Sequence, residues 1–307
     1  MANRQTAHGG RTLPELVSNG TPLEMTPERL GWLQPSDPGQ PLGELRDRYA
    51  RQGYLWLRGL LDREEVLAFR RHYFAATAET GLVAPDRDPV LGVMADSPAD
   101  RARLGARHLA IVHAEAFESL CRTPRMVAFY ERFLGGPVHL HGRKLLRHME
   151  PGAPHCTGAH YDLVYLRGGT DRLCTSWIPL GDTPVEMGGL CYLEGSDAWG
   201  RQKEAEHRTR TAHLDPAERV NAYNAHMAGG WLSRDLRALA HDAGLRWLVA
   251  DYAAGDMVVH SPYMIHASTM NTDGERRIRL SADIRYQLAA DPIDQRWQNL
   301  WRPDDGL

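Results

Sequence analysis

The chain of 307 residues is 42% hydrophobic and 24% charged, which is the composition of a soluble globular protein. Its formal net charge of −3 lacks the basic excess of nucleic-acid-binding proteins, and no apolar run approaches the roughly 18 residues of a membrane span. The four cysteines form neither a C-x-x-C pair nor a metal-ligand spacing, and the first residues lack the pattern of a signal peptide. We therefore expect a cytoplasmic protein with free, buried thiols and no nucleic-acid or membrane partner.

The N-terminal part of the chain is predicted to be a tail followed by helices around one strand. Residues 1–25 are polar without an apolar period and are expected to form a mobile tail. Residues 42–53 have the apolar spacing of a helix that ends at Gly53, and residues 54–58 form a short apolar strand. Asp62 is expected to cap the next helix, because two glutamates follow in its first turn.

The middle of the chain reads as helices followed by short strands with tight polar turns between them. The predicted helices are 106–120 and 124–134, and the predicted strands are 138–149, 162–166, 173–179 and 190–193. This pattern favours an antiparallel double-sheet jelly roll, that is, a cupin-like double-stranded β-helix.

Residues 199–244 interrupt the strand pattern. The segment is polar and helix-forming, and so long an excursion between two barrel strands is typical of a lid over a site or of an oligomer contact. The closing strands are predicted at 247–252, 257–260 and 277–286. We expect residues 1–307 to form a single domain, mainly β with flanking helices, as a monomer or a homodimer.

His160 and Asp162 are the pair around which the candidate site is built. They lie two apart in a stretch predicted to be extended, so both side chains point to the same face. An imidazole and a carboxylate on one face are two of the three ligands of the facial triad that holds non-haem Fe(II) with open positions. Because the chain has 15 histidines, such a pair arises easily by chance. It indicates a metal site only in combination with a third ligand.

His266 is predicted to be the third ligand, on a strand that follows the turn at Gly255-Asp256. His260 has the same strand parity but lies on the near side of a proline, which makes it the second choice. His148 and His155 are expected to be hydrogen-bonded or surface residues rather than ligands.

Arginines follow His266 at a distance that suits a dicarboxylate ligand of the metal, such as 2-oxoglutarate. The guanidinium of Arg277 can hold the far carboxylate in two hydrogen bonds, and Ser268 shares the face of His266 and can donate its hydroxyl to the same carboxylate. Arg279 has the parity of Arg277 and is either an ion-paired structural residue or a contact to the cosubstrate or to an acidic substrate.

Four blocks of the sequence together resemble the phytanoyl-CoA dioxygenase (PhyH) family of Fe(II)/2-oxoglutarate-dependent oxygenases. The blocks are 49–61, 160–162, 177–196 and 255–281, so they cover most of the chain. The third block departs from the family at its end, where Glu194-Gly195-Ser196-Asp197 stands in place of the frequent Pro-Gly-Ser-His. The departure concerns the local turn and not the metal ligands.

The resemblance implies a non-haem dioxygenase that takes Fe(II), 2-oxoglutarate and O2. It implies that Arg277 and Ser268 bind the distal carboxylate of 2-oxoglutarate. Thr175 and Trp177 share one face of the returning strand and are expected to line the cosubstrate pocket. The implied metal ligands are His160, Asp162 and His266.

The implied reaction is oxidation of a C–H bond of a small molecule in bacterial secondary metabolism, with release of succinate and CO2. A carboxylate at Asp162 favours hydroxylation, desaturation or ring formation over halogenation, in which a halide would take its place. Tyr165 and Tyr263 are near the metal ligands in sequence and are expected, with Arg279, to contact the substrate.

Two other classes of protein share parts of this pattern. A hydrolytic zinc site usually has a separate glutamate base, often in His-Glu-x-x-His, and the sequence has no such motif. A cupin-type isomerase or a non-catalytic metal-binding or small-molecule-binding protein would share the barrel but would not need the downstream arginine.

Overall fold

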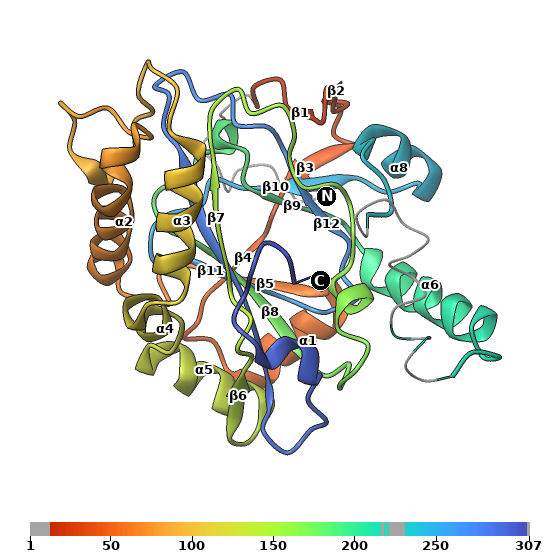
Figure 1. The fold of residues 1–307 in the computed structure, drawn as a ribbon. Coiled ribbons are helices and arrows are strands. Elements are labelled where there is room, and N and C mark those ends of the chain that lie inside the picture. Colours follow the sequence, from red (N-terminus) through yellow and green to blue (C-terminus); the bar gives the residue numbers. More distant parts are fainter. Residues whose placement is uncertain (1–12, 216–217, 219, 221–230, 306–307) are drawn as a thin grey trace.

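Two β-sheets form the centre of the protein (Figure 1). The computed structural model describes all residues except 1–12, 216–217, 219, 221–230 and 306–307. Neighbouring strands pair antiparallel, apart from the parallel pairs β3–β10 and β4–β5. The large sheet has the order β4 (Pro35–Ser36), β5 (Tyr54–Leu57), β11 (Met257–His260), β8 (Cys174–Pro179), β13 (Arg279–Leu288) and β6 (Val138–Leu140), and β7 (Leu145–Met149) also pairs with β13. The small sheet has the order β12 (His266–Ser268), β9 (Leu190–Leu193), β10 (Trp247–Val249) and β3 (Leu30–Trp32).

Strand alternation separates two apolar layers on the large sheet. Trp177 and Val258 point inward, where they meet Tyr192 of the small sheet in one buried cluster. The residues next to them in sequence, Ile178 and Val259, point outward into a second cluster beneath the helices. The inward faces of two sheets packed in this way confirm the predicted jelly roll, and they enclose the space in which the candidate site lies.

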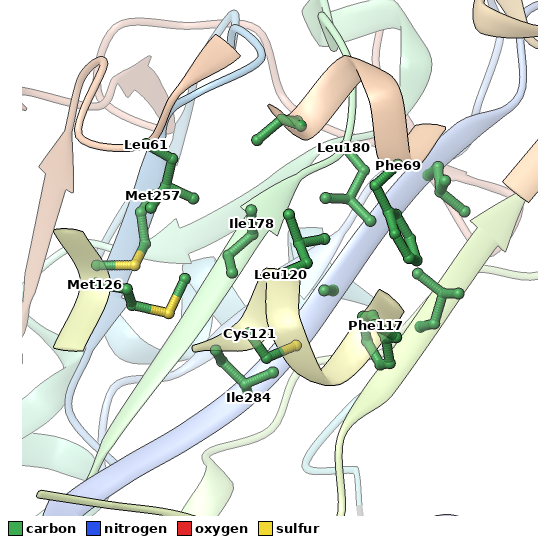
Figure 2. Packing of buried hydrophobic residues seen from close by; sticks show 14 of the residues in the cluster. Leu61, Phe69, Phe117, Leu120, Cys121, Met126, Ile178, Leu180, Met257 and Ile284 are labelled. Atoms are coloured by element: carbon green, nitrogen blue, oxygen red, sulfur yellow. The ribbon is translucent and has the colours of Figure 1, made fainter. Parts of the chain in front are cut away.

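Helices cover the outer face of the large sheet. Figure 2 shows how Phe69, Phe117 and Met126 of the helices pack with Ile178 and Met257 of the strands. These helices are α1 (Leu42–Gln52), α2 (Arg63–Thr77), α3 (Arg101–Val112), α4 (Glu115–Cys121) and α5 (Pro124–Leu134). Short 3-10 turns occur at Ala78–Thr80, Pro89–Leu91, Val185–Met187 and Gln295–Gln298.

Two predicted helix ends are confirmed. Helix α1 ends at Gly53, whose φ of 74° lies in the left-handed region that favours glycine. The side chain of Asp62 accepts hydrogen bonds from the backbone N–H groups of Glu64 and Glu65 and so caps α2. No helix in the described part of the chain combines the length and apolar character that crossing a membrane requires.

The N-terminal segment corrects the prediction of a tail over residues 1–25. Residues 1–12 lie outside the described part, but Leu16 and Leu23 are buried and belong to the cluster outside the small sheet. Strands β1 (Val17–Ser18) and β2 (Thr21–Pro22) form a hairpin, and the hydroxyl of Ser18 donates to the backbone carbonyl of Ser268. The segment from residue 13 therefore packs against β12, the strand that begins at His266.

Two predicted strands differ from the structure. The run 138–149 is divided into β6 and β7, and between them the backbone N–H of Arg143 donates to the carbonyl of Trp297 instead of to β13. Asp162–Tyr165 forms a 3-10 turn instead of a strand. Its residues Leu163 and Val164 are both buried, so this stretch lacks the alternation of a half-buried strand.

Helices α6 (Ser196–Arg210) and α8 (Leu236–Ala243), which belong to the region of the insertion 199–244, lie on the other side of the molecule from α2 and α3 (Figure 1). Helix α6 begins three residues earlier than the predicted segment, and α8 covers the outer face of the small sheet. Part of the stretch between them lies outside the described residues.

Candidate metal centre

The three predicted ligands meet in one cluster. His160, Asp162 and His266 each offer a ligand atom, and these atoms lie within 4.8 Å of one another. The backbones of His160 and His266 exchange hydrogen bonds of 3.0 and 2.9 Å, which sets the two imidazole rings side by side at 4.2 Å between centroids. Their Nε2 atoms lie 3.6 and 3.7 Å from Oδ1 of Asp162.

Backbone carbonyls fix the orientation of both imidazoles. Nδ1 of His160 is 2.9 Å from the carbonyl of Gly158, and Nδ1 of His266 is 2.9 Å from the carbonyl of Met264. Because a carbonyl only accepts, each Nδ1 carries the proton and each Nε2 keeps its lone pair for a metal. Burial, with the nearby His160 and His260, holds the pKa of His266 well below its usual range, so this imidazole is neutral, as ligation requires.

The carboxylate of Asp162 is held by one oxygen and open at the other. Oδ2 accepts hydrogen bonds from Oγ1 of Thr175 at 2.5 Å and from Nη2 of Arg285 at 3.1 Å. Burial would raise the pKa of Asp162, but the charge of Arg285, together with the neighbouring histidines, holds this pKa well below its usual range. Oδ1 is buried and has no hydrogen-bond partner.

This set of donors fits a divalent metal ion. A buried, ionised carboxylate oxygen is costly unless a cation or a donor meets it, and the two Nε2 atoms beside it are acceptors. Two imidazoles and one carboxylate form the facial triad typical of non-haem Fe(II), which leaves positions open for other ligands.

His260, the second choice as a ligand, lies behind the carboxylate. It is fully buried, and its Nδ1 is 2.8 Å from the hydroxyl of Tyr192. Its Nε2 is 3.5 Å from Oδ2 of Asp162, the oxygen that Thr175 and Arg285 already bind. His266 faces the open oxygen instead, so the geometry favours His266 as the ligand.

The inward face of β13 carries two buried arginines and a serine. Arg279 is 3% exposed, and its Nη1 donates to the carbonyl of Gly188 while its Nε has no hydrogen-bond partner. Burial lowers the pKa of Arg279 to about 10, so the group stays charged near neutral pH. Ser281, two residues on, is buried with an unpartnered hydroxyl. Arg279 and Ser281 thus offer free donors from the inward face of the barrel.

Arg277 is held by an acidic side chain of its own loop. Its Nη2 and Nε donate to the two carboxylate oxygens of Asp273 at 2.7 and 3.0 Å, and its side chain is 31% exposed. The prediction assumed that strand alternation extends back to Arg277. The alternation does reach Arg277, because Ile278 and Leu280 both pack in the outer cluster, but Asp273 holds the guanidinium of Arg277.

The other three residues predicted to contact the cosubstrate have the following neighbours. The hydroxyl of Thr175 donates to the carboxylate of Asp162 and helps to hold it in place. Trp177 is buried against Tyr252, with 4.7 Å between ring centroids. Ser268 follows His266 by two residues on β12, and its hydroxyl oxygen accepts from the backbone N–H of Thr157 at 3.0 Å while keeping its own proton to donate.

The two tyrosines predicted to contact the substrate lie in different places. The ring of Tyr165 is 5.9 Å from that of His160, beside the cluster. The hydroxyl of Tyr263 donates to Asp171 at 2.6 Å, and Arg201 of α6 lies over its ring at 4.1 Å. Tyr263 therefore joins the barrel to α6.

The region of the insertion is attached beside metal ligands at two points, Ser196 before it and Leu232 within it. At its start, the hydroxyl of Ser196 accepts from the backbone N–H of Ile265, next to His266. At its return, the backbone N–H of Leu232 donates to the carbonyl of Ala159, next to His160, at 2.6 Å. A Cβ on Gly158 would come within 2.8 Å of the Trp231 ring, so a glycine is required there.

One residue beside the metal ligands, Arg285, was missed in the sequence. Its signal is strand parity, because it shares the inward face of β13 with Arg279 and pairs in register with Thr175.

Comparisons with known proteins agree with this geometry. The model of the family described as "Phytanoyl-CoA dioxygenase (PhyH)" matches residues 49–278, three quarters of the chain. The chain belongs to this family. It is accordingly a non-haem Fe(II)/2-oxoglutarate-dependent dioxygenase, and the resemblance found in the sequence is confirmed.

Relatives of this dioxygenase include two hydroxylases of Streptomyces. The 1-deoxypentalenic acid 11-beta-hydroxylase of Streptomyces arenae is 26% identical over 255 residues, which cover 80% of this chain and 82% of that protein. The L-proline trans-4-hydroxylase of Streptomyces griseoviridis is 27% identical over 243 residues, which cover 77% of this chain and 84% of that protein.

A solved structure shares the fold of the dioxygenase. The epimerase SnoN in complex with Fe3+, alpha ketoglutarate and nogalamycin RO superposes with a TM-score of 0.51 at 21% identity, covering 82% of this chain and 85% of that one. This likeness confirms the cupin-like jelly roll.

Proposed function

We propose that this dioxygenase oxidises a C–H bond of a small molecule at an Fe(II) held by His160, Asp162 and His266. The observation that carries the proposal is the open Oδ1 of Asp162, which faces the Nε2 atoms of two imidazoles. Fe(II), when bound with 2-oxoglutarate and O2, supplies the oxidising power and releases succinate and CO2.

Arg279, in place of Arg277, is proposed to bind the distal carboxylate of 2-oxoglutarate. Three features support this role: Arg279 faces the barrel interior, it stays charged although buried, and its Nε lacks a partner. The free hydroxyl of Ser281 beside it, and that of Ser268, can donate to the same carboxylate. Arg277 is already neutralised by Asp273.

The surrounding residues keep the ligands in place and keep water out. Thr175 and Arg285 hold Oδ2 of Asp162, which leaves Oδ1 aimed at the imidazoles. The aromatic side chains of Trp177 and Tyr192 close the barrel interior behind the site. The protein thereby orients the C–H bond and limits side reactions with solvent.

The substrate class is proposed from the relatives. They are hydroxylases of 1-deoxypentalenic acid and of L-proline, both small carboxylic acids, in Streptomyces. A small molecule of bacterial secondary metabolism is therefore the proposed substrate, with hydroxylation, desaturation or ring formation as the outcome. A cytoplasmic location is proposed because the four cysteines are all free and buried.

The insertion is proposed to form one wall of the substrate pocket. Its returning chain pairs with Ala159 beside His160, and Trp231 lies against Gly158. Trp231→Ala is expected to change which substrates are accepted while substrate-free decarboxylation of 2-oxoglutarate persists. An unchanged substrate profile would favour the oligomer-contact interpretation.

The test of the function is metal-dependent turnover of 2-oxoglutarate, followed as succinate. Wild-type protein loaded with Fe(II) should form succinate with a panel of small carboxylic acids, and His266→Ala should abolish it. His148→Ala is the matched control, because His148 is a half-buried histidine bonded to Tyr73 instead of the metal cluster. Metal binding without succinate formation from any substrate would favour the non-catalytic alternative.

A further inference from the structure

Arg285 is a buried cation beside the metal ligands with donors left over. It is 4% exposed on the inward face of β13, and its Nη2 donates to Oδ2 of Asp162 at 3.1 Å. Its Nε and Nη1 are buried without a hydrogen-bond partner. A guanidinium buried in this way normally satisfies its donors, because each unmet one costs free energy.

The surroundings of Arg285 cover its flat face and leave its edge free. Trp297 lies against the guanidinium at 4.8 Å, and the indole N–H of Trp297 donates to the backbone carbonyl of Tyr165 at 2.9 Å. The ring of Tyr165 in turn stands 5.9 Å from His160. Arg285, Trp297 and Tyr165 thus form a continuous wall that reaches the metal ligands.

Once Fe(II) and 2-oxoglutarate are bound, no nearby acidic group among the described residues is left to neutralise Arg285. Arg143, which also lies against Trp297, is paired with Asp305, and Asp283 is paired with Arg147. The two charges of Fe(II) are offset by the two carboxylates of 2-oxoglutarate, and Asp162 offsets one of the arginines Arg279 and Arg285. Among the described residues around the site, one positive charge therefore remains, and a buried unpaired charge is unfavourable.

The position of Arg285 favours a second molecule as the source of the missing anion. Arg279 and Arg285 are six residues apart on an extended strand, about 20 Å between Cα atoms. A 2-oxoglutarate whose far carboxylate is on Arg279 leaves the Arg285 end of the pocket for the primary substrate.

We propose that Arg285 anchors a carboxylate of the primary substrate. Its free Nη1 and Nε flank the Nη2 that holds Asp162, so the substrate's carboxylate binds beside the metal on the same guanidinium. The substrate class is then a small molecule with a carboxylate close to the oxidised C–H bond. This inference rests on the proposed function, because the charge count assumes Fe(II) and 2-oxoglutarate.

The test uses carboxylic acids and their amides as matched probes. Wild-type protein is loaded anaerobically with Co(II) and saturating 2-oxoglutarate, and binding of benzoate, cyclohexanecarboxylate, benzamide and cyclohexanecarboxamide is measured by calorimetry. Each acid is expected to bind at least tenfold more tightly than its amide, because charge-assisted hydrogen bonds are about twice as strong as neutral ones. The Arg285→Gln variant should lose this preference.

Co(II) and 2-oxoglutarate affinities of each protein are measured first. If wild-type protein binds neither, the proposed function fails; if it binds both but prefers no acid, the anchoring role alone fails. If Arg285→Gln and Arg279→Gln lose 2-oxoglutarate affinity to the same extent, Arg285 binds the cosubstrate and the proposal is overturned. Should the Gln variant not fold or not bind Co(II), Arg285→Lys keeps the charge beside Asp162 but removes the planar fork. A full acid preference in the Lys variant would also overturn the proposal.

Discussion

Replacing Thr175 by valine isolates the support of the metal-binding carboxylate. Valine has nearly the shape of threonine, so the change removes a hydroxyl from a fully buried position without leaving a cavity. Asp162 keeps Arg285 on Oδ2 but loses the 2.5 Å hydrogen bond from Thr175, so Oδ1 is held less firmly toward the imidazoles. Loss of such an outer partner typically weakens metal binding 10–100-fold, or about 1.4–2.7 kcal/mol.

Ser176 provides a matched control for Thr175 on the same strand. It is equally buried, but it points to the opposite face, where its hydroxyl bonds that of Tyr130 of α5 at 2.5 Å. Thr175→Val and Ser176→Ala should each lower the free energy of unfolding by about 1–3 kcal/mol. Only Thr175→Val should weaken Co(II) binding, measured by anaerobic titration alongside urea denaturation.

The reasoning would be refuted by equal metal affinities in wild-type protein and Thr175→Val. A variant that binds metal normally but binds 2-oxoglutarate weakly would instead support the sequence-based prediction that Thr175 contacts the cosubstrate.

Three further predictions concern charge. Arg279→Gln should raise the Kd of 2-oxoglutarate at least 30-fold, consistent with about 2–5 kcal/mol for one side of a buried charged pair, while Arg277→Gln changes it less than threefold; the reverse order in an anaerobic titration would restore the role to Arg277. Burial lowers the pKa of His141 to about 4, below its unfolded value near 6.5. Stability is therefore full above pH 6.5 and should fall by up to about 3 kcal/mol as the pH drops to 4; denaturation at several pH values should show a shallower fall in His141→Gln, and an unchanged slope would contradict the assignment. Glu204→Gln, which breaks the buried pair with Arg167, should cost about 3–5 kcal/mol of unfolding free energy in urea denaturation, and a loss below about 1 kcal/mol would show that the pair is not a buried charge pair.

Sequence periodicity predicted the parts of the site that lie on regular backbone. His160 and Asp162 share a face because Tyr161 between them is extended, and the cap at Asp62 follows from local hydrogen bonding. These features depend only on residues that are close together in the sequence, so the spacing of residue types is enough to predict them.

Features set by distant contacts could not be read in the same way. Arg277 and Arg279 have equal parity, and what separates them is the carboxylate of Asp273, which binds Arg277. The packing of Leu16 likewise depends on a surface formed elsewhere in the chain. An apolar residue in a polar segment gave too weak a signal to predict that contact.

The attachment of the 199–244 insertion beside the metal ligands has a consequence for divergence within the family. Its start is tied to Ile265 and its return to Ala159, so the intervening residues can vary in length and composition between two fixed points. Under the proposed role of the insertion as a wall of the substrate pocket, new substrate preferences can arise by mutation in this segment while the ligand geometry is inherited unchanged. Transplanting such a segment between relatives at Ser196 and Leu232 is the natural route to an enzyme with exchanged selectivity.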